Sequence, residues 1–240
     1  MHEIMELKML VHGLRALGEF ARAAPVDAVG FARAAGLGAD RAATLLNVYE
    51  QTGYALKVPH GPLHVPTRLT LELFADANPL GALAACAIEP VATLAAETGA
   101  AATLSIRRDG RTLCCTASQA LAEPHLRVGG GQGLHDGTIG LLQLACARSL
   151  AEDPGGFSIV RAGEGIDQTM AAHGTVAVPV VTDQNDVAVL AVHADSAAAR
   201  AGDLLPAMRR TARLIVRAQR ETLAAVSGAP PSLLSLATFH

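Results

Sequence analysis

The chain has 240 residues, half of them apolar, and a formal net charge of −3 from 19 basic and 22 acidic side chains. This length suits two domains, because a folded domain usually holds about 100–200 residues. The balanced charge excludes a strongly basic nucleic-acid coat and a polybasic membrane binder, but it allows a local DNA-reading surface. The longest nearly apolar stretch, residues 80–88, is much shorter than the roughly 20 residues of a spanning helix. We therefore expect a soluble, cytoplasmic protein that makes no membrane contact.

The four cysteines do not have the spacing of a metal site or of a redox pair. Cys86, Cys114, Cys115 and Cys146 include no C-x-x-C pattern, so we expect reduced thiols and no structural metal. No nucleotide-binding fingerprint is present either, and no cofactor is expected. With two tyrosines, five phenylalanines and no tryptophan, the chain also lacks the stacking platforms that single-stranded nucleic acids require.

The first part of the chain predicts three short helices. Apolar residues from Leu10 to Phe20 recur at helical spacing and predict a first helix that ends before Pro25. Asp27 is expected to cap a second helix. The residues of this second helix expected to face inward are Val29, Ala32 and Ala35.

Asp40 is expected to cap the third helix, which extends to Gln51 and buries Ala43, Leu46 and Tyr49. Two apolar strands over residues 54–58 and 63–67 then flank a Pro-His-Gly-Pro turn. Three helices followed by a two-stranded ribbon predict a winged helix-turn-helix.

The rest of the chain changes from a helical to a strand pattern. A helix is expected over residues 80–98, broken or kinked at Pro90. Residues 102–107 and 112–116 flank an Asp-Gly pair, a strong hairpin signal. A second hairpin is expected from residues 175–181 and 187–193, and a final amphipathic helix from residues 203–226.

Short segments in both parts of the chain, taken in order, match a known family. They are residues 14–17, 31–37, 51–54, 94–99, 126–129, 134–135, 140 and 176–180. In order and spacing over about residues 10–220, they resemble the IclR family of bacterial transcriptional regulators. The resemblance implies a GAF-like effector-binding domain, a homodimer or tetramer, and a small organic ligand.

The resulting fold prediction is an α+β chain. It has a winged helix-turn-helix over residues 1–68, a helical linker over residues 69–79 and a GAF-like α/β effector-binding domain over residues 80–226, with a mostly antiparallel sheet. Residues 227–240 form a C-terminal tail with no assigned role.

The resemblance places DNA contacts on the third helix. Its usual leading lysine and hydroxyl residues are absent, and Arg41, Thr44 and Asn47 are the side chains suited to a base edge or a phosphate. Asp40 would face phosphate unless its carboxylate caps the helix. The alternative is that these side chains are simply solvated.

The predicted ribbon offers Lys57, together with His60 and His64, for contact with the DNA backbone or minor groove. Residues 1–70 contain seven basic and six acidic side chains, a net charge of +1. This net positive charge is small for a DNA-binding domain, because DNA affinity comes largely from neutralised phosphates.

The resemblance places the effector between the sheet and a glycine-rich turn, here residues 129–133. Exposed N–H groups in such a turn can bind a carboxylate or carbonyl oxygen, although the run is equally compatible with an ordinary loop. Residues 135–140 correspond to a helix start, whose free donors favour an anionic ligand. The expected effector-binding residues are Leu126, Val128, Gly129, Gly130, Thr138, Ile139, Thr175, Ala191 and His193.

His193 is the most informative of these positions, because the family commonly has a small hydroxyl residue there. Period-two spacing puts it on the same sheet face as Ala191, towards the expected cavity. We interpret it as a hydrogen-bonding pocket residue before a catalyst or a metal ligand.

The main hypothesis is a ligand-responsive regulator of a small-molecule metabolic operon. Its partners would be operator DNA, an effector that is a carboxylate or an aromatic compound, and further copies of the chain. The alternative is a hydrolase-type or proton-transfer enzyme that keeps the winged helix for dimerisation, with His193, His135 and Asp136 as catalytic residues. Other histidines, His125 and His173, and the adjacent cysteines supply suitable residue types without a known spacing.

Overall fold

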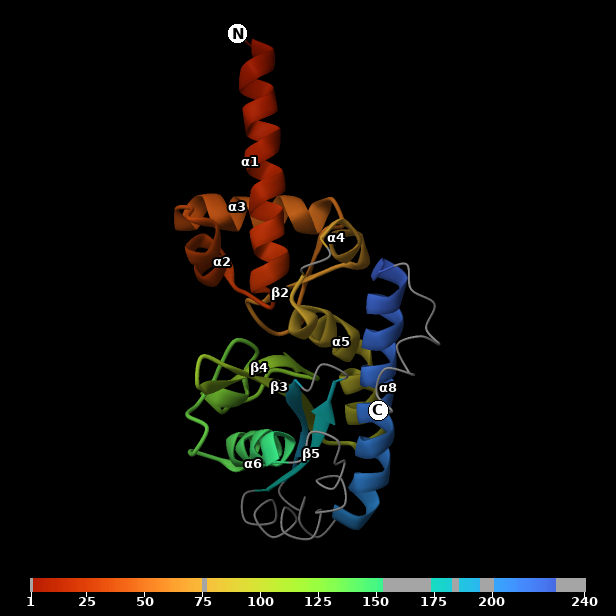
Figure 1. Ribbon diagram of the computed structural model, residues 1–240. Helices are drawn as coiled ribbons and strands as arrows, with labels where there is room; N and C mark the ends of the chain where they lie inside the picture. Colours follow the sequence, from red (N-terminus) through yellow and green to blue (C-terminus); the bar gives the residue numbers. More distant parts are fainter. Residues whose placement is uncertain (1, 75–76, 153–173, 183–185, 195–200, 228–240) are drawn as a thin grey trace. The chain divides into compact units, whose positions relative to one another are not determined.

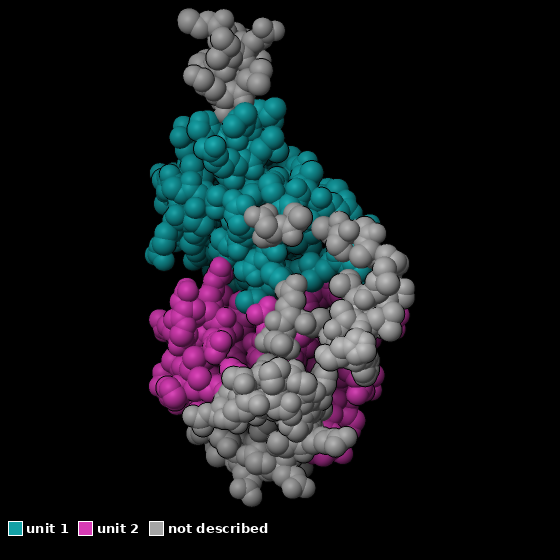
Figure 2. Space-filling view, in the orientation of Figure 1, with its two compact units in different colours: residues 1–58, 62–85, 221–240 teal, residues 59–61, 86–220 magenta. Residues whose placement is uncertain are grey.

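The computed structural model describes residues 2–74, 77–152, 174–182, 186–194 and 201–227. It divides into two compact units: residues 1–58, 62–85 and 221–240 form unit 1, and residues 59–61 and 86–220 form unit 2 (Figure 2). Helices and antiparallel sheets occur together, so the predicted α+β class is confirmed. His173 and residues 228–240 of the predicted tail lie outside the described residues. The predicted domain boundaries stay predictions.

Unit 1 begins with three helices, α1 (His2–Ala23), α2 (Ala28–Ala35) and α3 (Ala39–Gln51) (Figure 1). Asp27 caps α2 as predicted, because its side chain accepts a 2.7 Å hydrogen bond from the Gly30 amide. Gly36 then adopts the left-handed conformation, with φ of 65°, and closes the helix.

The predicted cap of α3 is wrong. Gly38 occupies the N-cap position without a side-chain hydrogen bond, and Asp40 lies inside the first turn. An acidic residue there still favours the helix, because the free N–H groups of the first turn carry partial positive charge. The Asp40 carboxylate remains on the exposed surface.

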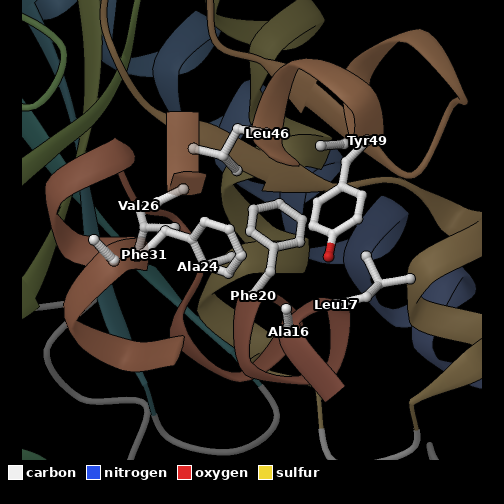
Figure 3. Close-up of a cluster of buried hydrophobic side chains, with 11 residues drawn as sticks. Ala16, Leu17, Phe20, Ala24, Val26, Phe31, Leu46 and Tyr49 are labelled. Atoms are coloured by element: carbon white, nitrogen blue, oxygen red, sulfur yellow. The ribbon is translucent and has the colours of Figure 1, made fainter. Parts of the chain in front are cut away.

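An aromatic cluster holds the three helices together (Figure 3). Phe20, Phe31 and Tyr49 come from the three helices in turn, and their ring centroids lie 5.9–6.1 Å apart. Such contacts add stability beyond area burial. The Tyr49 hydroxyl donates to the Gly13 carbonyl at 3.1 Å, and burial raises the pKa of Tyr49 to about 12.

Two of the predicted inward-facing residues are corrected by this cluster. Val29 is 59% exposed, and Phe31 is the buried residue of α2. In α3 the buried alanine is Ala42, while Ala43 is only partly covered. In α2 the buried face is centred on Phe31, because its large ring occupies the interior.

A two-stranded antiparallel ribbon follows, formed by β1 (Ala55–Lys57) and β2 (His64–Pro66). The helix α4 (Arg68–Leu73) comes next, and two threonine hydroxyls tie it to the start of the ribbon. Thr67 donates to the Gly53 carbonyl and Thr70 to the Tyr54 carbonyl, both at 2.6 Å. Three helices and a ribbon are thus present in the predicted order.

Helix α5 (Pro79–Thr98) is continuous through Pro90, so the predicted break is absent. The Asn78 side chain accepts from the Leu80 amide at 3.0 Å and caps its start. Contrary to the sequence-based expectation, α5 is long and apolar enough to cross a membrane by length and composition. Its fully buried residues include Leu83, Val91 and Leu94.

The sheet of unit 2 has the strand order β4-β3-β6-β5, and every neighbouring pair is antiparallel. Its strands are β3 (Ala101–Arg108), β4 (Arg111–Ala117), β5 (Thr175–Val181) and β6 (Val187–His193). The predicted Asp109-Gly110 turn joins β3 to β4, and both residues have positive φ, 49° and 73°. This is the backbone that a two-residue hairpin requires.

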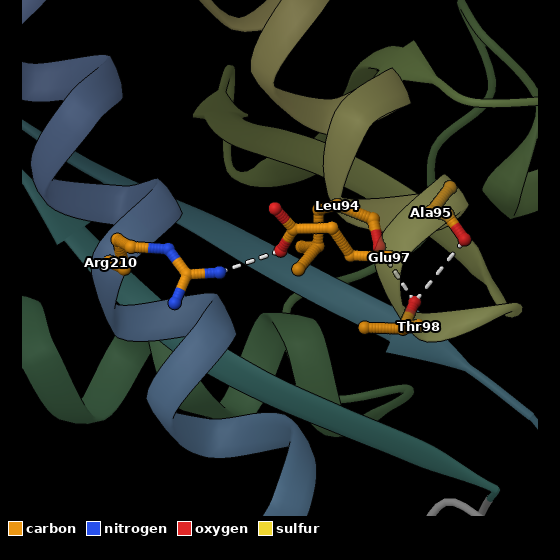
Figure 4. Close-up of polar contacts among 5 residues, drawn as sticks. All are labelled: Leu94, Ala95, Glu97, Thr98 and Arg210. Carbon is orange, nitrogen blue, oxygen red and sulfur yellow. Dashed lines mark hydrogen bonds and ion pairs between the residues drawn. The ribbon is translucent and has the colours of Figure 1, made fainter.

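Helix α6 (Thr138–Glu152) lies on one side of this sheet and α8 (Ala201–Ser227) on the other (Figure 1). The Gln143 side chain of α6, fully buried, donates to the Ser105 carbonyl of β3 at 3.1 Å. Arg210 of α8 forms a 2.7 Å ion pair with Glu97 near the end of α5, where Thr98 bonds back to Leu94 (Figure 4). These contacts fasten both helical layers around the sheet.

Candidate functional site

The candidate DNA-contacting residues of α3 lie on one exposed face. Arg41, Thr44 and Asn47 are all exposed and recur at a spacing of three residues. Thr44 donates its hydroxyl proton to the Asp40 carbonyl at 2.8 Å, so its hydroxyl oxygen is left to accept. Arg41 and Asn47 therefore supply the side-chain donors of this face.

The charge of α3 is slightly negative. The helix carries one basic residue, Arg41, and two acidic residues, Asp40 in the first turn and Glu50 in the last. Asp40 is exposed and has no capping role that would occupy it. A phosphate approaching the start of α3 would meet a like charge.

The ribbon adds one exposed cation, Lys57 at the end of β1. His60 is exposed in the turn, but His64 is buried, with its Nε2 3.8 Å from the Glu50 carboxylate. Burial lowers the pKa of His64, and the nearby Glu50 opposes that shift. The predicted contact of His64 with DNA is wrong, because its ring packs inside unit 1.

A cavity of about 710 Å³ lies in unit 2. Three strand ends form one wall, and the loop before α6 together with the first residues of α6 forms the rest. Its lining residues are Gly99, Ala100, Ala101, Gln119, Leu121, Glu123, His125, Leu126, Gln132, Asp136, Gly137, Thr138, Ile139, Gly174, Thr175, His193 and Ala194. The volume lies within the range of about 300–1,000 Å³ that is usual for small-molecule sites.

His193 is held in this wall by two threonines. Its Nε2 lies 2.9 Å from the Thr103 hydroxyl on β3, and its Nδ1 lies 3.1 Å from the Thr175 hydroxyl on β5. A neutral ring donates through one nitrogen and accepts through the other, and hydroxyls can satisfy either arrangement.

Desolvation lowers the pKa of His193 to about 4, with Glu123 opposing the shift and His125 adding to it. His193 is therefore neutral near pH 7. Because both ring nitrogens are bonded to threonine hydroxyls, His193 brings neither a positive charge nor an unoccupied ring nitrogen to the cavity.

Thr138 is the first residue of α6 and also lines the cavity. Thr138 is 7% exposed, and its Oγ1 has no hydrogen-bond partner among the described residues. A buried hydroxyl without a partner is costly, so a bound group that pairs with it would be favoured.

The cavity also contains two carboxylates, Glu123 and Asp136. The loop that carries Glu123 is pinned by Arg127, whose guanidinium donates to the Leu121 and Ala122 carbonyls at 2.9 and 2.8 Å. The Arg127 guanidinium is thus bonded to the loop backbone, and Arg127 is not among the residues that line the cavity. Among the described residues that line the cavity there is no lysine or arginine.

The glycine-rich run packs against β4 instead of offering free N–H groups. The amides of Gly129, Gly130 and Gln132 donate to Cys114 O, Arg127 O and the Thr112 hydroxyl, respectively. A Cβ added at Gly130 would lie 2.0 Å from the Pro124 carbonyl oxygen, so the backbone needs glycine for close packing. The expected anion cradle at Gly129 and Gly130 is therefore wrong.

The structure brings five of the nine expected effector-binding residues to the cavity: Leu126, Thr138, Ile139, Thr175 and His193. The other four lie outside its lining. Val128 and Ala191 are buried in packing, and Gly129 and Gly130 belong to the run against β4. Ala191 pairs with Thr103 and Ala177 on the neighbouring strands, which explains its burial.

The alternative catalytic set is not assembled. His193 and Asp136 line the cavity, but His135 is exposed and lies outside the lining. The Thr103–His193 pair resembles a nucleophile and base, yet Thr103 is fully buried and a base with a pKa of about 4 is poorly matched to neutral pH.

Metal and thiol chemistry are also unsupported in the described part of the chain. No group of three histidine, cysteine or acidic side chains there could hold a metal ion. Cys114, Cys115 and Cys146 are buried, and desolvation raises the pKa of each thiol, to about 12 for Cys114 and about 11 for Cys146. Such thiols are poor nucleophiles.

Sequence reasoning missed Thr103, Gln119, Leu121 and Glu123. Thr103 reaches His193 only because β3 lies beside β6, a pairing between strands that are far apart in sequence. The other three lie in a loop without periodicity, so no local signal indicated them.

No family model and no curated protein matches the chain. Several solved structures that are similar to it over most of its length are IclR-family transcriptional regulators.

Three of these structures illustrate the likeness. An IclR homologue from Microbacterium hydrocarbonoxydans, complexed with 4-hydroxybenzoate, is 20% identical, with 89% of this chain and 99% of that one covered and a TM-score of 0.42. The IclR regulator of Alicyclobacillus acidocaldarius is also 20% identical, with coverages of 88% and 98% and a TM-score of 0.42. Thermotoga maritima IclR is 16% identical, with coverages of 88% and 98% and a TM-score of 0.43. At these values the likeness assigns neither an effector nor an operator to this chain.

Proposed function

We propose that this chain is a cytoplasmic, homo-oligomeric transcriptional regulator that binds operator DNA through α3 and the ribbon and responds to a small organic effector. One observation carries the proposal: the chain combines an exposed polar face on the third of three packed helices with a separate, ligand-sized cavity containing an unpartnered buried hydroxyl. A regulator needs both parts, because effector and DNA must bind distinct sites whose affinities are coupled.

Arg41 is the main candidate for base reading within this proposal. Its planar fork matches the two acceptors on the major-groove edge of guanine, a contact worth about 1–3 kcal/mol. Asn47 can pair with adenine in the same groove, and Lys57 can neutralise a phosphate. The negative balance of α3 predicts modest nonspecific affinity, so specific contacts would supply a large share of binding.

The test is fluorescence anisotropy with DNA flanking the chain's own gene, in the presence of excess nonspecific competitor. Arg41→Ala is expected to weaken specific binding by about 5- to 100-fold, the equivalent of that contact energy. Arg213→Ala is the matched control, since it removes the same charge from an exposed position on α8 in unit 2. Equal affinities for wild type and Arg41→Ala at low and high salt would contradict the proposed reading helix.

The cavity supports effector binding through hydrogen bonds. Its described residues supply an unpaired threonine hydroxyl and two glutamines, Gln119 and Gln132, within a partly apolar wall, beside a neutral histidine that is itself held by two threonines. Such a set recognises and orients a ligand without transforming it. A decrease or an increase in operator affinity on ligand addition would be the direct sign of regulation.

A further inference from the structure

The described lining of the cavity has an excess of negative charge, and this excess affects which ligands it can bind. The start of α6 presents unpaired backbone N–H groups, equivalent to about half a positive charge, which by itself favours an anion. Against it stand two formal negative charges on exposed residues of the lining, Glu123 and Asp136. No lysine or arginine balances them among the described lining residues.

Nearby cations do not offset these carboxylates. Arg127 and Arg111 both donate to backbone carbonyls, of residues 121, 122 and 131. The described residues include no ion pair to Glu123 or Asp136. His193 is bonded to two threonines and neutral, so it adds no charge either.

Asp136 is an exposed residue held close to Gly133. Its amide donates to the Gly133 carbonyl at 3.1 Å, and its carboxylate lies over Gly133, where an added Cβ would meet Oδ2 at 2.3 Å. Gly133 thus leaves the room that this carboxylate occupies. A ligand at the start of α6 meets this negative group two residues before the helix begins.

Thr138 adds the second part of the recognition pattern. Its buried Oγ1 lacks a partner among the described residues, and Thr138 is the first residue of α6, so the hydroxyl lies at the same end of the helix as the first-turn N–H groups. An uncharged carbonyl or hydroxyl oxygen can accept from these donors. A nitrogen carrying hydrogens can donate to the two carboxylates in turn.

We propose that the cavity selects a small amide or amine over the corresponding carboxylic acid, with the ligand oxygen at Thr138 and the ligand N–H groups facing Glu123 and Asp136. This inference deepens the proposed function, on which it rests for treating the cavity as the effector site. It replaces the carboxylate, one of the two effector classes expected from sequence, because a carboxylate would face two like charges and the described lining residues include no lysine or arginine to compensate them.

The test compares isosteric probes on the free, full-length chain by calorimetric titration up to millimolar concentration. The probes are benzamide and benzoate, with benzylamine as a cationic third compound. Benzamide or benzylamine is expected to bind about tenfold or more tightly than benzoate. Thr138→Val, which removes only the hydroxyl, should weaken benzamide binding and leave the weak binding of benzoate unchanged.

A charge-neutralising double variant, Glu123→Gln with Asp136→Asn, should reduce the preference by strengthening benzoate binding. The matched control is Glu89→Gln with Asp109→Asn, which makes the same change at two exposed positions outside the cavity. If the double variant does not fold, as judged by its thermal transition, Glu123→Gln alone serves the same purpose.

Tighter binding of benzoate than of benzamide in the wild type would overturn the inference, as would an unchanged preference in the folded variants. Absence of binding by all three probes would also overturn it. Because no DNA is present, these results are independent of operator binding. A chain that binds benzamide but no DNA would contradict the regulator and leave the ligand preference standing.

Discussion

The two compact units hold their polar residues in opposite ways. In unit 1 the residues proposed for partner contact, Arg41, Asn47 and Lys57, are exposed and include the cations. Around the cavity of unit 2, Thr103 and Thr138 are buried and His193 is partly buried and neutral, while the charged residues, Glu123 and Asp136, are exposed carboxylates and not cations. Exposed charges act over a distance and are screened by salt, whereas covered hydrogen-bonding groups are also part of the packed structure. Changes in unit 1 should therefore alter partner affinity, and changes around the cavity should alter stability as well.

The largest expected effect is the loss of stability in acid. The folded pKa of His193, about 4, lies below its ordinary value of 6.5, so below pH 6.5 the unfolded chain binds a proton that the folded chain does not. The contribution is fully present above pH 6.5 and is lost as the pH falls towards 4, on the order of 3 kcal/mol in total. His64, whose pKa is also lowered, acts in the same direction.

This acid effect is measured by urea unfolding across that pH range in wild type and His193→Gln. The variant should show a shallower fall, because glutamine keeps hydrogen-bonding groups but does not titrate. His12→Gln, at an exposed position on α1, should behave like wild type. Parallel pH profiles for His193→Gln and wild type would remove His193 as a source of the loss.

Removing the hydroxyl behind His193 should produce the next largest effect. Thr103→Val preserves shape but leaves Nε2 of His193 without its partner at 2.9 Å, which costs about 1–3 kcal/mol of unfolding free energy. Arg41→Ala, an exposed change in unit 1, should stay within about 0.5 kcal/mol. Urea unfolding checks both, and equal losses in the two variants would break the contrast between the units.

The ribbon lysine should act through salt-dependent binding. If Lys57 neutralises one phosphate, Lys57→Ala lowers the slope of log affinity against log salt by about 0.9 and weakens binding to all sequences alike. Anisotropy at several salt concentrations measures this slope, with Arg213→Ala as the control. An unchanged slope would exclude a phosphate contact by Lys57.

The smallest effect is expected from Asp40. Because its carboxylate is exposed and does not cap α3, Asp40→Asn removes a like charge near the phosphates and should raise DNA affinity by about two- to fivefold. The gain should shrink with added salt. Asp109→Asn provides the control, and weaker binding by Asp40→Asn would mean that this carboxylate accepts a hydrogen bond from the DNA.

Local patterns predicted those features that depend on neighbouring residues. The Asp109-Gly110 pair predicted a hairpin because a tight turn needs two successive residues with positive φ, which few residue types adopt. Both residues have positive φ here. Asp27 was identifiable as a cap from its place before an apolar helix. Two apolar runs on either side of the polar residues 183–186 placed the bounds of β5 and β6 correctly, since a strand buried on both faces is a near-continuous apolar run.

Other expectations failed where distant packing decided the outcome. Phe31 displaced Val29 from the interior because its ring fits between Phe20 and Tyr49. The amides of the glycine run were expected to be free, but those of Gly129 and Gln132 donate to β4 and that of Gly130 donates to the Arg127 carbonyl. Neither result can be read from spacing, because each depends on an element elsewhere in the chain.

For the candidate sites, sequence by itself determined the residue types and which of them share a helix or strand face. It placed Arg41, Thr44 and Asn47 on one side of a helix and His193 at the end of a strand. Tertiary structure decided which polar groups find a hydrogen-bond partner. Because β3 lies beside β6, Thr103 bonds to His193, while the Thr138 hydroxyl has no partner among the described residues. Hydrogen bonding and desolvation depend on the groups brought together in space, and chain neighbours alone do not specify them.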